Sequence, residues 1–303
     1  MKRILILSIC AATVLAGCNS AANSNSTAPA TDTSKLKAEV ELPKELHTEL
    51  YGIYSGMFET PEDITTSDSY QEPVKITINI TRITETGVEG KSAVRGNVRP
   101  MSGTLSAGGN GQLFVMDEPG SDKHDGRFNF KIVGDSLIGT WEAYDRNAVK
   151  EYKKNYRLVK TPFIYNPNLM LPDEIEYVDY QKSRVQRTVY KGENDAVDTS
   201  VTEFYRSASD VIFKLNASKT LLTEKQLKNL RKLDLEILRN SIYARHGYAF
   251  KSPVVRQFFD GVDWYQPISD NVEGDLTAVE KQNVELLKRF EKYAKDNYDY
   301  FGR

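Results

Sequence analysis

One short segment near the end of this sequence gathers side chains suited to acid–base chemistry. His246 is one of three histidines, and an imidazole in the last turn of a helix can act as a general base. A hydrolase hypothesis pairs it with a nearby carboxylate, such as Asp263 or Glu236, at the mouth of a cleft. A structural role is favoured, because His246 flanks an apolar stripe at a helix end. There it can bond to terminal carbonyls and pack against Trp264 or Tyr265.

Two arginines in the same segment allow anion binding. The guanidinium of Arg239 or Arg245 could hold an anionic glycan or a peptide carboxylate through two parallel hydrogen bonds. Either could instead tie its helix to loop carbonyls, and the structural interpretation is favoured here as well.

Metal and cofactor sites have little support. Four acidic residues surround Gly120 and Gly126, but their spacing does not match a calcium-binding EF-hand loop, so a solvated hairpin tip is predicted. The four are Asp117, Glu118, Asp122 and Asp125. His47 and His124 are far apart and lie in expected loops. We expect no metal, no cofactor and, in the absence of a nucleophile or phosphate-binding motif, no enzyme.

Cysteine chemistry is confined to the start of the chain. Cys10 and Cys18 are the only two cysteines. Lys2 and Arg3 precede an apolar stretch of the length a secretory signal needs, and Leu15-Ala16-Gly17-Cys18 ends it. This run resembles the lipobox of bacterial lipoproteins, which implies cleavage before Cys18 and attachment of lipid, such as palmitate, to it. An ordinary signal peptide and a short membrane helix are the alternatives, and the stretch is short for a membrane span.

Composition limits the partners. Charged residues make up 27% and hydrophobic residues 40% of the 303 residues, as in a water-soluble globular chain of about two domains. A formal net charge of −2 leaves no basic excess to neutralise phosphates, so nucleic acid is not an expected partner.

The sequence divides into five expected parts. Residues 1–17 are the signal peptide, and 18–44 are the lipidated cysteine with a flexible tether rich in Ser, Ala, Asn, Thr and Pro. A β-rich domain follows at 45–160, a loop and bridging segment at 161–212, and a helical domain at 213–303. The bridging segment contains an expected strand, Thr188 to Gly192, that could belong to a hairpin.

Short strands with turns between them characterise the β-rich domain. The residues 74–83 alternate apolar and polar side chains with a period of two. The other expected strands are 51–58, 112–116, 127–133, 136–144 and 152–159. They predict an antiparallel meander closed into a small barrel or sandwich. Gly139-Thr140-Trp141 resembles a lipocalin element only weakly, since it stands near the domain's end. An interior filled by its own side chains is favoured over an open ligand cavity.

The helical domain shows a period of 3.6. Thr223 and Gln226 form an expected capping box. Asp234 is the expected N-cap of the next helix, and Gly247 is its C′ residue in the left-handed conformation. A last helix is expected over 276–293. The fold class is therefore α+β, with the β meander before a small, mostly helical domain.

The segment Tyr243-Ala244-Arg245-His246-Gly247 supports a family assignment. With the aromatic pair Phe258-Phe259, then Trp264-Tyr265, and a later helix carrying Glu280 and Asn283, it resembles the YARHG domain of exported bacterial proteins over about 213–293. The motif residues are Arg239, Asn240, Tyr243, Arg245, His246, Gly247, Trp264 and Tyr265. One departure is Ser241, where the family more often has an acidic residue.

Three functions follow as hypotheses. The first is a membrane-anchored envelope lipoprotein that binds or scaffolds peptidoglycan, another envelope protein or a small ligand. The others are the hydrolase based on His246 and a lipocalin-like carrier of an apolar ligand. Asn19, which is not acidic, implies attachment to the outer membrane facing the periplasm, while a Gram-positive membrane anchor stays open.

Overall fold

The computed structural model describes residues 43–64, 72–108, 111–191 and 197–295. The expected signal segment, Cys18 and nearly all of the expected tether lie outside these residues. Within the described ranges, no helix is both long enough and apolar enough to cross a membrane.

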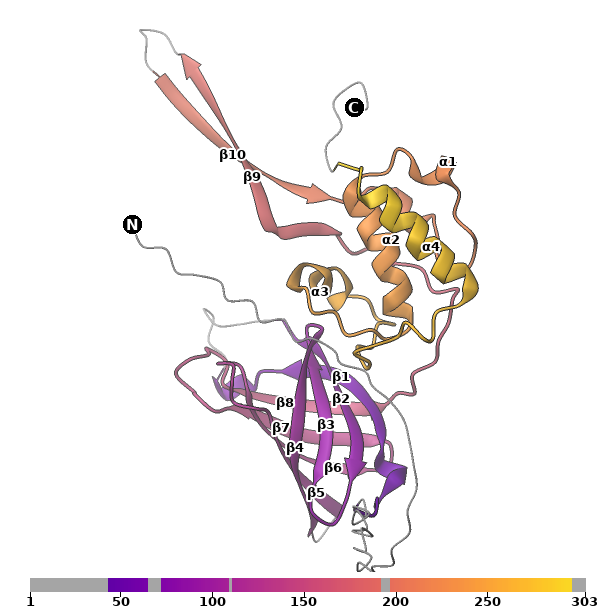
Figure 1. The fold of residues 1–303 in the computed structure, drawn as a ribbon. Helices are drawn as coiled ribbons and strands as arrows, with labels where there is room; N and C mark the ends of the chain where they lie inside the picture. Colours follow the sequence, from indigo (N-terminus) through magenta and orange to yellow (C-terminus); the bar gives the residue numbers. More distant parts are fainter. Residues whose placement is uncertain (1–42, 65–71, 109–110, 192–196, 296–303) are drawn as a thin grey trace, which may run out of the picture. The chain divides into compact units, whose positions relative to one another are not determined.

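The β-rich domain is a closed antiparallel barrel. Each strand pairs with the next one along the chain, and β1 pairs with β8 to complete the ring (Figure 1). The strands are β1 (Gly52–Glu59), β2 (Val74–Ile83), β3 (Val88–Val94), β4 (Asn97–Gly108), β5 (Gly111–Asp117), β6 (Gly126–Val133), β7 (Ser136–Ala143) and β8 (Lys153–Lys160). The predicted meander is confirmed, and of the two closures the chain adopts the barrel.

Strands β3 and β4 were not among the expected strands. They form a hairpin whose two-residue turn, Arg95-Gly96, has φ angles of 49° and 66°. Two positive φ values are the geometry of a type I′ turn, whose twist matches that of the flanking strands.

Alternating apolar side chains fill most of the barrel. Ile76, Ile78 and Ile80 of β2 are buried as the period-two pattern predicts. They join a cluster in which the rings of Phe114 and Phe130 stack with centroids 4.8 Å apart. The interior is therefore largely filled by its own side chains, except at one end.

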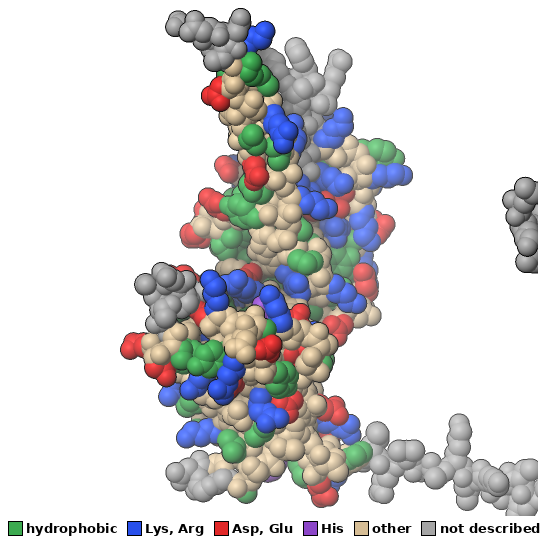
Figure 2. Space-filling model, turned by 90° about the vertical axis from the view of Figure 1, so that its left-hand side faces the viewer, with side chains coloured by type: hydrophobic (Ala, Val, Ile, Leu, Met, Phe, Trp, Pro, Cys, Tyr) green, Lys and Arg blue, Asp and Glu red, His purple; other side chains and the backbone are tan. Residues whose placement is uncertain are grey.

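A two-stranded hairpin follows the barrel. Strand β9 (Val178–Lys191) pairs with β10 (Val197–Ser207), and with no other strand of the described residues, so the expected strand at Thr188 does belong to a hairpin. Most of its side chains are exposed. On the face drawn in Figure 2, Lys and Arg side chains are intermixed with Asp and Glu, and hydrophobic side chains occur in small groups.

The helical region contains four helices in its described part. They are α1 (Glu224–Leu227), α2 (Lys232–Arg245), α3 (Pro253–Asp260) and α4 (Ala278–Glu291), with short 3₁₀ helices at η1 (Thr48–Leu50), η2 (Glu62–Ile64) and η4 (Asp210–Phe213) elsewhere in the chain. Helices α2 and α4 pack side by side (Figure 1). Leu238 and Ile242 of α2 are fully buried in the hydrophobic core of the helical region, together with Leu287 of α4.

One helix start was predicted wrongly. Asp234 is not the N-cap of α2, because the helix begins at Lys232 and Arg231 is the N-cap. Asp234 is the third helical residue, where its buried carboxylate accepts hydrogen bonds from Arg231 N at 2.9 Å and from Ser209 N at 2.7 Å. The acidic side chain still satisfies free N–H groups at the helix start, but from inside the helix.

Candidate functional site

His246 lies in a closed internal cluster at the end of helix α2. Its Nε2 is 2.8 Å from Glu280 Oε2 of helix α4, and its ring stacks on Tyr165 with centroids 4.2 Å apart. The side chains of His246 and Glu280 are 5% and 0% exposed. The expected packing against Trp264 or Tyr265 is not the contact it makes, and its partner is neither Asp263 nor Glu236. The geometry that the hydrolase hypothesis required is absent from these described residues.

Glu280 has its hydrogen-bonding capacity well used. One oxygen accepts from Tyr165 Oη at 3.1 Å, and the other accepts from Thr277 N at 2.9 Å as well as lying against His246. Burial alone would raise the pKa of Glu280, but the bonds from His246, Ser218 and Thr277 outweigh it and lower the pKa to about 2. The carboxylate therefore stays ionised and holds α4 to the end of α2.

Arg245 is buried without a carboxylate partner. Its Nε and Nη2 donate to Leu169 O at 2.9 and 2.6 Å, and Nη1 donates to Ser241 Oγ at 2.9 Å. The guanidinium also lies over the Trp264 ring, 5.6 Å from its centroid. Burial lowers the pKa of Arg245 to about 10. It ties the helix to one loop carbonyl, in line with the structural interpretation, and Ser241 supplies a hydroxyl acceptor for it from the preceding turn.

Gly247 ends helix α2 as predicted. Its φ is +72°, and the bonds Gly247 N to Ala244 O and Tyr248 N to Tyr243 O close a Schellman motif. Trp264 Nε1 donates to Met170 O at 2.8 Å, and Tyr265 Oη donates to Tyr248 O at 2.8 Å. Both aromatic residues of the motif therefore fasten loops to the helical core.

The remaining motif residues lie beside a shallow groove of about 370 Å³. Arg239 binds Glu291 through two hydrogen bonds of 2.6 and 3.2 Å and donates to Asn240 Oδ1 at 3.1 Å. Asn240 is only 6% exposed. Tyr243 Oη donates to Glu273 Oε1 at 3.4 Å. The motif is thus split between the closed cluster and this groove.

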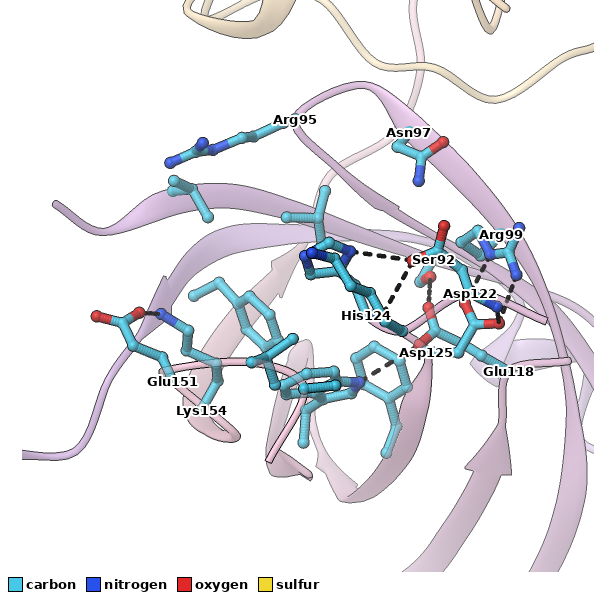
Figure 3. Close-up of a pocket in the computed structure, with 18 of the residues that line it drawn as sticks. Ser92, Arg95, Asn97, Arg99, Glu118, Asp122, His124, Asp125, Glu151 and Lys154 are labelled. Carbon is cyan, nitrogen blue, oxygen red and sulfur yellow. Dashed lines mark hydrogen bonds and ion pairs between the residues drawn. The ribbon is translucent and has the colours of Figure 1, made fainter. Parts of the chain in front are cut away.

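A larger cavity lies in the barrel, in a region that the sequence did not single out. Its volume is about 600 Å³, within the range of small-molecule sites. It occupies the end where β1 finishes, where β2 starts, and where the β3–β4, β5–β6 and β7–β8 connections lie (Figure 3). We call it the barrel-mouth cavity. Its lining is Phe58, Val74, Ser92, Val94, Arg95, Asn97, Arg99, Glu118, Asp122, Lys123, His124, Asp125, Phe128, Trp141, Ala148, Val149, Lys150, Glu151 and Lys154.

One wall of the barrel-mouth cavity carries two buried carboxylates. Asp125 accepts from Arg99 Nε at 2.8 Å and Nη2 at 2.5 Å. Glu118 accepts from Ser92 Oγ at 2.7 Å, from Gly126 N at 2.8 Å and from Trp141 Nε1 at 3.4 Å. Figure 3 shows both acidic side chains on the same side of the cavity. Burial raises the pKa of Glu118 despite these hydrogen bonds.

The opposite wall carries a second buried ion pair. Lys154 Nζ is bound to Glu151 Oε2 and donates to Thr60 Oγ1 at 2.6 Å (Figure 3). Both charged residues are less than a tenth exposed. The second oxygen of Glu151, Oε1, is buried and has no hydrogen-bond partner among the described residues.

Aromatic rings form the apolar part of the lining. The rings of Phe58 and Trp141 meet edge to face with centroids 5.7 Å apart, and Phe128 lies 6.4 Å from Phe58. Gly126 permits this packing, since a Cβ there would lie 2.5 Å from Trp141 Nε1. The cavity therefore combines aromatic rings on which a small molecule could stack with ion-paired and hydrogen-bonding side chains.

The sequence interpretation missed this site for an identifiable reason. The acidic segment after β5 was taken for a solvated hairpin tip, which is wrong for Glu118 and Asp125 because both are buried. Asp122 and His124 do lie exposed at the rim. Among the described side chains no group of three or more His, Cys, Asp or Glu residues is placed to hold a metal ion.

Comparison with known proteins identifies one domain. Residues 209–292 match the YARHG domain family, so the resemblance is confirmed and this chain contains a YARHG domain there. This is a small domain without an assigned function. Neither the curated proteins nor the solved structures provide a match to the chain.

Proposed function

We propose that this protein is a lipid-anchored envelope protein that binds a small ligand in the barrel-mouth cavity. The observation that carries the proposal is the cavity of about 600 Å³ with its aromatic lining and buried charged groups. A filled barrel would offer no such space. Five polar residues that are less than a tenth exposed border the cavity, namely Ser92, Glu118, Asp125, Glu151 and Lys154. Buried polar groups of this kind fix the orientation of a bound molecule.

The anchor is supported by the sequence. The run Leu15-Ala16-Gly17-Cys18 gives the chain an acceptor for lipid, and Asn19 favours the outer membrane as its destination. The polar segment that follows would let the folded domains work at a distance from the bilayer. The YARHG domain would then be an internally braced module, whose groove beside Tyr243 supports contact with peptidoglycan or another envelope protein as a second candidate function.

The ligand site is tested by obstructing the cavity. Ala148 lines it and is exposed, so Ala148→Trp should fill space without disturbing the core. Asn147, its exposed neighbour, does not line the cavity, and Asn147→Trp is the matched control. With the neutral fluorescent probe N-phenyl-1-naphthylamine, we expect Ala148→Trp to weaken binding about tenfold or more. Equal binding by both variants, or no binding by the wild type, would reject the cavity as the site.

The anchor is tested by Cys18→Ala. We expect the variant to fold normally and to leave the membrane fraction, because a lipid on Cys18 is the proposed attachment. Cys10→Ala, inside the signal, is the control and should remain with the membrane. Retention of the Cys18→Ala protein in membranes would contradict the anchor and leave the ligand site unaffected.

A further inference from the structure

The buried charges around the barrel-mouth cavity do not balance. Three carboxylates less than a tenth exposed border it, Glu118, Asp125 and Glu151. Two cations bind them, since Arg99 pairs with Asp125 and Lys154 pairs with Glu151. No Lys, Arg or His of the described chain forms an ion pair with Glu118. Among the described residues Glu118 is therefore left without a directly bound cation, although the charge of Arg99 acts on it from a distance.

The donors that Glu118 does have are neutral. They are the hydroxyl of Ser92, the backbone N–H of Gly126 and the indole N–H of Trp141. An ionised carboxylate has about four lone-pair directions, so these three donors leave room for a further one. A buried charge without a partner is costly, and a cation entering the cavity would relieve that cost.

On the opposite wall of the cavity, the carboxylate of Glu151 has an acceptor oxygen without a hydrogen-bond donor among the described residues. Glu151 Oε1 is buried and unpartnered, although the other oxygen of the same carboxylate is held by Lys154. Leaving a buried acceptor unsatisfied is unfavourable. An N–H group of a bound molecule would satisfy it.

The aromatic lining suits a positive charge as well. The ammonium of Lys154 lies 6.0 Å from the centroid of the Phe58 ring, so this wall already accepts a cation over an aromatic face. The Phe128 and Trp141 rings extend the same surface. The basic residues at the rim, Arg95, Lys123 and Lys150, are exposed. Water screens such charges, and they weigh less in ligand choice than a buried carboxylate.

We propose that the barrel-mouth cavity selects a small organic cation, an amine with an apolar body, whose charge lies beside Glu118 and whose body packs on Phe58, Phe128 and Trp141. This inference rests on the proposed function and narrows the class of its ligand. Lys154 stays paired with Glu151.

Three probes that share one apolar body but differ in charge distinguish a preference for positive charge from a preference for shape. We would measure binding of 4-phenylbutylamine, 4-phenylbutanol and 4-phenylbutyrate to the whole protein by calorimetry or by displacement of N-phenyl-1-naphthylamine. The amine should bind about tenfold tighter than the alcohol, and the acid should bind most weakly. Binding of none of the three would reject the cavity as a ligand site. Equal binding of amine and alcohol, or tightest binding of the acid, would overturn the cation preference while leaving the site itself.

Two matched variants assign the preference. Glu118→Gln removes the charge but keeps a hydrogen-bonding side chain, and should abolish the tenfold preference for the amine without changing binding of the alcohol. Asp145→Asn removes an exposed carboxylate of the β7–β8 connection that does not line the cavity, and should leave the preference intact. Thermal unfolding confirms that each variant is folded. If Glu118→Gln does not fold, the preference of the wild type for the amine decides the question. A folded Glu118→Gln protein that still prefers the amine would refute the assignment.

Discussion

Two buried clusters of charged side chains, one at the end of helix α2 and one at the mouth of the barrel, differ in what they leave open. In the helical cluster, His246 faces Glu280 and Arg245 bonds to Leu169 O, and none of their polar atoms is left buried without a partner. At the barrel mouth, no described residue forms an ion pair with Glu118, and one oxygen of Glu151 has no hydrogen-bond partner among the described residues.

The difference in unused hydrogen-bonding capacity distinguishes a cluster that stabilises the fold from one that could bind a ligand. Polar groups that satisfy one another inside a closed core hold elements together and have no capacity left for a ligand. Polar groups that border free volume with capacity unused are what a binding site requires. By this criterion we assign the bracing role to the YARHG motif and propose the barrel-mouth cavity as the binding site.

The largest expected effect tests the bracing role at the helix end. Gly247→Val should destabilise the protein by about 3 kcal/mol or more, because a β-branched residue is strained at a φ of +72°. A Cβ there would also lie 2.7 Å from Ile268 Cγ1 and 2.9 Å from Gln266 O. Urea unfolding followed by circular dichroism measures the loss.

Gly134→Val is the matched control for that substitution. Gly134 has a similar φ of +58°, but a Cβ there would meet no atom within 4 Å. We expect a loss of about 1 kcal/mol, which is the conformational part alone. Equal losses at the two glycines would show that crowding at the end of α2 has no energetic weight, and the closed cluster would lose its role as a brace.

The second prediction concerns the buried pair itself. Glu280→Gln should cost about 3 kcal/mol near neutral pH, because it leaves His246 without its carboxylate. The folded-state pKa of Glu280 is about 2, below its ordinary value. Its contribution is therefore present above the unfolded-state pKa and is lost as the pH falls towards 2. The gap in unfolding free energy between wild type and variant should narrow over that range.

Glu285→Gln provides the reference for that titration. Glu285 lies on the same helix, but its side chain is 76% exposed and pairs only with Lys288. Its substitution should shift the unfolding curve little at any pH. A gap for Glu280→Gln that stayed constant from pH 7 to pH 2 would mean that its charge does not stabilise the cluster.

The third prediction tests the cavity wall. Arg99→Gln should destabilise the barrel by about 2 kcal/mol, because Asp125 would lose both guanidinium hydrogen bonds while its side chain stays 2% exposed. The variant should also strengthen the preference for cationic probes, since a second carboxylate becomes uncompensated. Thermal unfolding and the three phenylbutyl probes give the two readouts. A stable variant with unchanged selectivity would place the ion pair outside the binding function.

The sequence predicted elements with a strong local period and missed those without one. Strand β2 was predicted in full because its isoleucines recur at every second residue. Strands β3 and β4 were not, because Gly90, Pro100 and Gly103 interrupt the pattern. Helix α3 was not predicted for a similar reason. It has only eight residues, which are too few to show a helical period of apolar side chains.

The candidate site was harder to predict because its pairs join residues far apart in the chain. Arg99 and Asp125 are 26 residues apart, and Glu118 and Trp141 are 23 apart. The barrel brings Arg99 of β4 and Trp141 of β7 to the β5–β6 connection, which carries both carboxylates, and a register shift of one residue would turn the two strand side chains to the other face. The sequence favoured a structural role for His246, but its partner Glu280 on α4, 34 residues away, could not be identified from the sequence.

The smallest effect is expected at an exposed ion pair of the barrel, which belongs to neither buried cluster. Arg127 binds Asp117 in the same two-bonded geometry that Arg99 uses with Asp125, at 2.8 and 3.1 Å, and lowers the pKa of Asp117. The side chain of Arg127 is 54% exposed, however, so water can replace the hydrogen bonds that Asp117 loses when Arg127 is substituted. Arg127→Gln should therefore leave both the melting temperature and probe binding within experimental error of the wild type. A loss as large as that of Arg99→Gln would mean that geometry, and not burial beside the cavity, determines what an ion pair contributes in this barrel.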